Sequence, residues 1–176
     1  MVLTFASPEW CEAIGKSISE GPHSHWFKSC MEDLKAGLGI GEITMVARAT
    51  DANVALVCEL TTDGCKNCYM TTDPDSVPDV FIELSGTLHS WLSVLCGLQP
   101  TFTTLVGPVS SDIDRRINIT KFAGGMENIP SQIMKPLPLN LLYAVTHAIK
   151  DVCIGPTDVT EVPGVNLDIL MGRVHH

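Results

Sequence analysis

Four short β-like runs in the first half of the sequence most constrain what this chain can fold into. Apolar and other residues alternate over 43–48, and an almost continuous apolar run follows over 54–60. Two shorter runs cover 68–71 and 78–84. The connections carry turn signals: Asp51-Ala52-Asn53, Asp63-Gly64 and Asp73-Pro74-Asp75-Ser76. Because parallel neighbours need long crossovers, these short connections predict an antiparallel meander of four strands.

Helical periodicity precedes the meander. Ser7 and Pro8 are typical of an N-cap and a first helical residue, and they open a helix that we expect to continue to Ser19. A second helix is predicted over 26–36, where apolar residues recur three and four positions apart.

Further helices are predicted after the meander. Helical spacing recurs over 88–96, a short piece is expected over 100–106, and a clear amphipathic helix covers 139–152. A weak helix around 129–134 is expected to be broken by Pro136 and Pro138. Between these helices, the alternation of apolar residues over about 115–122 favours a fifth strand.

Segregated helices and strands are typical of the α+β class. We therefore predict a five-stranded, mainly antiparallel sheet with helices covering one face. The chain has 176 residues, enough for one domain, which we place at 1–152 with an irregular C-terminal tail over 153–176.

The net charge and the hydropathy of the chain limit the kinds of partner that we expect. Twenty acidic residues against 11 basic ones give a net charge of −9, which disfavours nucleic acids and anionic membrane surfaces. No apolar run approaches the roughly 20 residues of a transmembrane helix. The N-terminal residues lack the basic region of a secretory signal, so a cytoplasmic location is expected.

The chain contains seven cysteines, an odd number that argues against a disulfide framework in the cytosol. Cys65 and Cys68 form the one pair with the Cys-x-x-Cys spacing found in metal and redox sites. A structural zinc site would need two more ligands, and no second pair is present in the sequence. The pair is thus interpreted as the edge of a hairpin without a role, or alternatively as a thiol or zinc site.

No enzyme signature is present. The sequence lacks the Gly-x-Ser-x-Gly, dinucleotide-binding, P-loop and His-Glu-x-x-His patterns. His147 lies beside an apolar helical stripe, which favours a structural histidine, and His89 is expected to face solvent. We therefore predict a chain without catalytic residues, metal or cofactor.

One stretch resembles a known family. The sequence Pro78-Asp79-Val80-Phe81-Ile82-Glu83-Leu84-Ser85-Gly86-Thr87-Leu88 is similar to a strand that leads directly into a helix in the sterol carrier protein-2 family. The following residues, 88–100, match the spacing of leucine, glycine and proline in that family, and 103–107 stands where its members have a small helix ending in glycine. Residues 108–114 depart from the pattern as an insertion that displaces the next strand.

The resemblance implies a non-catalytic carrier with an apolar tunnel for a sterol, fatty acid, acyl-CoA or similar lipid. The side chains expected to face the ligand are apolar and lie on the later helices and strand: Trp91, Leu95, Phe102, Leu105, Phe122, Met134, Leu142, Val145 and Ile149. Arg115 and Arg116 are candidates to meet an acidic head group, or alternatively pair with nearby acids. A second interpretation is an accessory subunit whose apolar helical surface packs on an enzyme partner or on a second copy of the chain.

Overall fold

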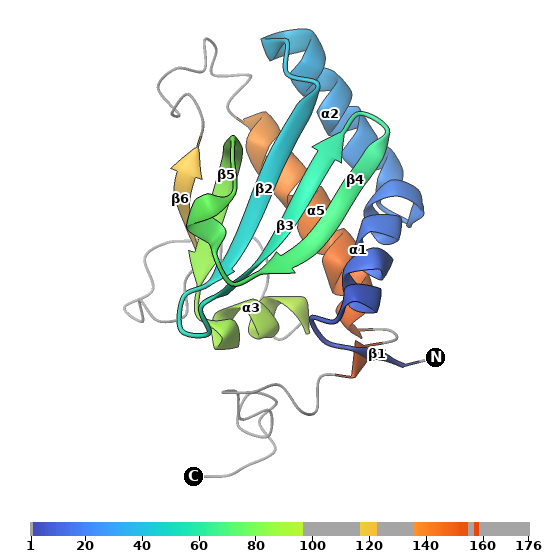
Figure 1. Cartoon of the computed structure of the whole chain (residues 1–176). Coiled ribbons are helices and arrows are strands. Elements are labelled where there is room, and N and C mark those ends of the chain that lie inside the picture. The colour runs from blue at the N-terminus through green and yellow to red at the C-terminus, as the bar shows by residue number, and fades with distance from the viewer. Residues whose placement is uncertain (1, 97–116, 123–135, 155–156, 159–176) are drawn as a thin grey trace.

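The computed structural model describes residues 2–96, 117–122, 136–154 and 157–158. Within these ranges the protein is an α+β structure built on a mixed β-sheet (Figure 1). The α+β class predicted from the sequence is confirmed.

The two N-terminal helices follow from their capping residues. Helix α1 (Pro8–Glu20) begins where the Ser7 side chain accepts a hydrogen bond from the backbone N–H of Trp10 at 3.2 Å, as predicted. Helix α2 (Ser24–Leu38) ends at Gly39, whose φ of 70° is the left-handed conformation that glycine adopts most readily. Both helices bury a stripe of residues three and four positions apart.

The sheet has the strand order β4-β3-β2-β5-β6. Its members are β2 (Glu42–Ala49), β3 (Val54–Thr61), β4 (Gly64–Thr71), β5 (Val80–Gly86) and β6 (Asn118–Phe122). The pairs β2–β3, β3–β4 and β5–β6 are antiparallel, whereas β2 and β5 are parallel. A separate parallel pair joins β1 (Leu3–Thr4) to β7 (Thr157–Asp158).

The predicted meander is therefore wrong at its last strand, and the sheet is mixed. The chain leaves β4 and crosses β3 and β2 before it enters β5 beside Thr44. The eight residues 72–79 carry the chain over this distance through a short 3-10 turn, without an α-helical crossover. A short connection therefore does not always form a hairpin, because here it carries the chain past two strands to a parallel partner.

The crossover packs on the sheet face opposite to α5. Its turn η1 (Pro74–Ser76) buries Pro74, and Val77 packs against a small cluster formed by Val46, Ala55 and Val57. Arg48 on β2 holds the turn in place by donating a hydrogen bond to Asp75 at 2.9 Å. The connection between β4 and β5 thus also covers part of this face of the sheet.

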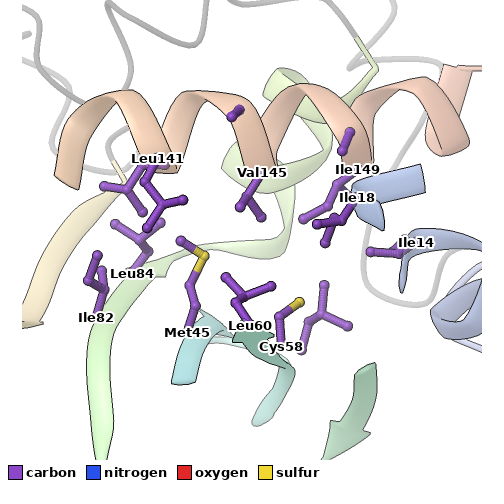
Figure 2. Packing of buried hydrophobic residues seen from close by; sticks show 14 of the residues in the cluster. Ile14, Ile18, Met45, Cys58, Leu60, Ile82, Leu84, Leu141, Val145 and Ile149 are labelled. Atoms are coloured by element: carbon purple, nitrogen blue, oxygen red, sulfur yellow. The ribbon is translucent and has the colours of Figure 1, made fainter. Parts of the chain in front are cut away.

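Helices cover the other face of the sheet (Figure 1). Helix α5 (Pro136–Ile154) contacts α1, α2 and α3 (Leu88–Leu95), and α1 also contacts β4. Figure 2 shows Leu141, Val145 and Ile149 of α5 directed at the side chains of the sheet. The main hydrophobic core lies between these layers.

Helix α5 begins at Pro136 rather than at the predicted residue 139, because both Pro136 and Pro138 fit in its first turn. Backbone N–H groups there have no partner within the helix, so proline costs no hydrogen bond. The helix also continues to Ile154, past the predicted domain limit at 152, and Cys153 is buried in the core. The helical pieces expected over 100–106 and 129–134, and most of the tail, lie outside the described residues.

Candidate functional site

A cavity of about 380 Å³ lies at one end of the helix-covered face of the sheet. It is bounded by the ends of β2 and β3, by α3, by the later half of α5 and by the N-terminal segment. Helix α3 crosses this end of the sheet (Figure 1). The volume falls within the range of roughly 300–1,000 Å³ that is typical of small-molecule sites.

The sheet contributes a wall of small side chains. Ala47 and Ala49 follow Ile43 and Met45 along β2, and each presents a single methyl group where a larger residue would fill the space. Ala52, in the turn after β2, also lines the cavity and is exposed, which places the opening at this turn.

Helix α3 supplies a rigid opposite wall through Leu88, Trp91 and Leu95. The backbone N–H of Leu88 donates to the Asp51 carboxylate at 2.9 Å, which ties the start of the helix to the β2–β3 turn. The Trp91 indole Nε1–H donates to the carbonyl oxygen of Arg48 at 2.9 Å. This bond fixes the ring, so Trp91 cannot swing inward to fill the cavity.

Helix α5 and the N-terminal segment close the remaining sides. Ile149 and Thr146 line the cavity from α5, and the Thr146 hydroxyl donates to the Leu142 carbonyl at 2.7 Å within the helix. Thr146 therefore places no unsatisfied polar group in the wall. The ring of Phe5 packs on that of Trp10 with 4.8 Å between centroids, and both contribute to the wall.

The chemistry of this site is that of an apolar container. None of the described residues that line it carries a charge. Within the described ranges, no group of three or more histidine, cysteine, aspartate or glutamate side chains is placed to hold a metal ion. What the arrangement can do is remove apolar surface from water, worth about 25 cal/mol per Å².

The residues predicted to face a ligand fall into three groups. Trp91, Leu95 and Ile149 line the cavity. Leu142 and Val145 are about 1% exposed and pack in the core instead. The others lie outside the described residues or have side chains outside them: Phe102, Leu105, Arg115, Arg116, Phe122 and Met134.

Sequence reasoning missed the alanine wall and the N-terminal residues Phe5 and Ala6. A signal was present in β2, where two alanines occupy the inward positions that a packed strand would fill with larger residues. The contribution of Phe5 and Ala6 left no such signal, because it depends on a contact between distant parts of the chain.

Comparisons with known proteins bear on the fold. No protein-family model matches the sequence, and no curated protein matches it either. The structure is similar to the solution structure of a conserved hypothetical protein from Thermus thermophilus, described as a possible sterol carrier protein. The TM-score is 0.51 at 14% identity, over 86% of this chain and 92% of the other. At that identity the likeness shows a shared fold.

No helix in the part of the chain that the structure describes combines the length and the apolar character needed to cross a bilayer.

Proposed function

We propose that this protein is a non-catalytic carrier that binds a hydrophobic small molecule, such as a fatty acid or another lipid, in the cavity between β2, α3 and α5. The observation that carries the proposal is the uncharged wall around about 380 Å³, with Ala47 and Ala49 opposite a fixed Trp91. The fold shared with a possible sterol carrier protein supports it.

The energetics suit reversible binding. A lipid that buries about 300 Å² of apolar surface gains about 7 kcal/mol before ordering costs. That gain supports affinities in the micromolar range when the wall is preformed. No bond to the ligand has to form or break, so the proposed role needs no catalytic group.

The experiment that tests this role is a titration with a fluorescent fatty-acid probe. The parent protein is expected to bind the probe saturably, with a Kd in the micromolar range. The double variant Ala47→Leu/Ala49→Leu fills the wall and is expected to weaken binding by at least about tenfold, since it removes the space that the chain of the probe would occupy.

Ala36→Leu is the matched control, because Ala36 is exposed on α2 and away from the cavity. It makes the same chemical change and should leave the Kd unaltered. Absence of saturable binding to the parent protein, or equal affinities in all three proteins, would contradict the proposal. Far-UV circular dichroism confirms that each variant is folded.

A further inference from the structure

Four cysteine thiols gather where α1 packs on β3 and β4, outside the cavity. Cys58 and Cys68 are directly opposite each other in the β3–β4 register, and their sulfur atoms are 3.8 Å apart. The Cys65 thiol donates a hydrogen bond to the Asn67 carbonyl oxygen at 3.3 Å, and Cys65, Cys68 and Cys11 of α1 line the same surface groove.

A β-bulge brings Cys65 and Cys68 to the same face. Residues three apart on a regular strand point to opposite faces of a sheet. In β4, however, Asn67 pairs with Glu59 and Cys65 pairs with Leu60, so Lys66 is an extra residue. The extra residue returns Cys65 to the face of Cys68, against α1.

Small residues let α1 approach this face closely. A Cβ placed on Gly15 would lie 3.7 Å from the Cys65 sulfur, and the Ser19 hydroxyl accepts a hydrogen bond from the Cys65 backbone N–H at 2.9 Å. Gly64 has a φ of 139°, and a Cβ there would lie 2.4 Å from the Ser19 hydroxyl oxygen. Both the conformation and the close approach therefore require glycine at 64.

Cys65 is the reactive member of the cluster by position and by charge. It is half-buried and lines a surface groove of about 440 Å³ together with Cys11 and Cys68. Interaction with the Cys58 thiol, followed by that with Cys68, lowers the pKa of the Cys65 thiol. The contact with Cys65 raises the pKa of Cys58, and the contacts with Cys11, Cys58 and Cys65 raise the pKa of Cys68. A thiolate is thereby favoured at Cys65, which is half-buried in the groove, whereas Cys58 is buried.

We infer that Cys58, Cys65 and Cys68 form a redox site that small-molecule disulfides oxidise, with a cross-strand disulfide between Cys58 and Cys68 as its product. The sulfur atoms must close from 3.8 Å to about 2.0 Å, which is within reach of a side-chain rotation. Directly opposed cysteines on antiparallel strands also have Cα separations of about 4.5–5.5 Å, inside the range that disulfides allow.

The oxidation proceeds by thiol–disulfide exchange with a disulfide RSSR. The Cys65 thiolate attacks one sulfur of RSSR, which forms a mixed disulfide and releases RS⁻. Cys68 then attacks the Cys65 sulfur and releases the second RS⁻, and Cys58 attacks Cys68 and returns Cys65 as a thiolate. The Cys58 and Cys68 protons pass to the two RS⁻ ions. One RSSR is reduced to two RSH, and two protein thiols are oxidised.

The test exposes the reduced, folded chain to one equivalent of oxidised glutathione, then alkylates the free thiols and maps them by mass spectrometry. The expected product carries a Cys58–Cys68 disulfide and a free Cys65. Cys65→Ser should slow its formation about tenfold, because the thiolate that begins the exchange is lost. Cys96→Ser is the matched control: Cys96 is also half-buried, but burial raises the pKa of its thiol, and its loss should not change the rate.

A second measurement needs no variant. The initial rate in the parent protein should change little between pH 6 and 8, whereas attack by an ordinary thiol rises nearly tenfold per pH unit over that range. A tenfold rise per unit, or full alkylation of both Cys58 and Cys68 after oxidation, would overturn the inference. Stoichiometric zinc that protects these thiols until a chelator is added would also overturn it.

Discussion

The two halves of strand β2 lie under the same helical layer, yet one half is packed and the other is hollow. Ile43 and Met45 join the main core, where Met45 meets the α5 side chains (Figure 2). Ala47 and Ala49 line the cavity. The helical layer is rigid, so the larger side chains of Ile43 and Met45 set its distance from the sheet. The helices therefore do not move closer to the sheet at Ala47 and Ala49. Empty space in this fold thus follows from two small residues rather than from a special backbone.

The largest expected loss of stability is in the packed half. Leu60 is fully buried in the core, and Leu60→Ala should lower the free energy of unfolding by about 4 kcal/mol through lost contacts and a new cavity. Leu95→Ala at the hollow end should cost only about 2 kcal/mol, because Leu95 already lacks neighbours on its cavity side. Urea unfolding compares the two. Equal losses would show that the two halves are packed alike.

Substitutions that add volume should show the same contrast between the packed and the hollow half. Ala144 on α5 is fully buried in the core, so Ala144→Leu should overpack it and cost about 1–3 kcal/mol. The Ala47→Leu/Ala49→Leu double variant has space to occupy and should change stability by less than about 1 kcal/mol. Thermal unfolding measures both. A larger loss in the double variant would mean that the hollow is too small for added side chains.

A smaller loss of stability is expected at Trp91, in the wall that α3 contributes to the cavity. Trp91→Phe removes the hydrogen bond to the Arg48 carbonyl and should lower stability by about 1 kcal/mol. It should also reduce the change in tryptophan fluorescence that a bound fatty acid produces, because Trp91 lines the cavity and only Trp10 remains there as a reporter. An undiminished fluorescence change would place the ligand away from α3.

The smallest expected effect is the contribution of His147, on α5, to the pH dependence of stability. Burial, followed by the positive charges of His23 and Lys150, lowers the pKa of His147, and Asp151 opposes them. The neutral imidazole is therefore favoured in the folded state. Its contribution is complete above the unfolded pKa of about 6.5 and is lost as pH falls below that value. Unfolding free energies should thus fall from pH 7 to 5, and fall less in His147→Gln; an identical slope in both would contradict this.

Local features of the sequence were enough to predict much of the fold. The Ser7 cap and the Pro8 start of α1 leave clear local signals, as does the helical spacing that begins at Leu88. The parallel pairing of β2 with β5 was missed, because it depends on where an eight-residue connection goes rather than on its length. The cavity was only partly predicted for a similar reason. Trp91 and Ile149 were placed correctly, but helical spacing could not separate them from Leu142 and Val145, which pack in the core.

The most direct measurement of the central claim is native mass spectrometry of the full chain, purified without detergent, followed by solvent extraction of whatever is bound. We predict a hydrophobic compound at up to one molecule per chain in the parent protein and in Ala36→Leu. We predict none in Ala47→Leu/Ala49→Leu. A parent protein that carries no such compound and takes up no added fatty acid, or a double variant that carries as much as the parent, would contradict it.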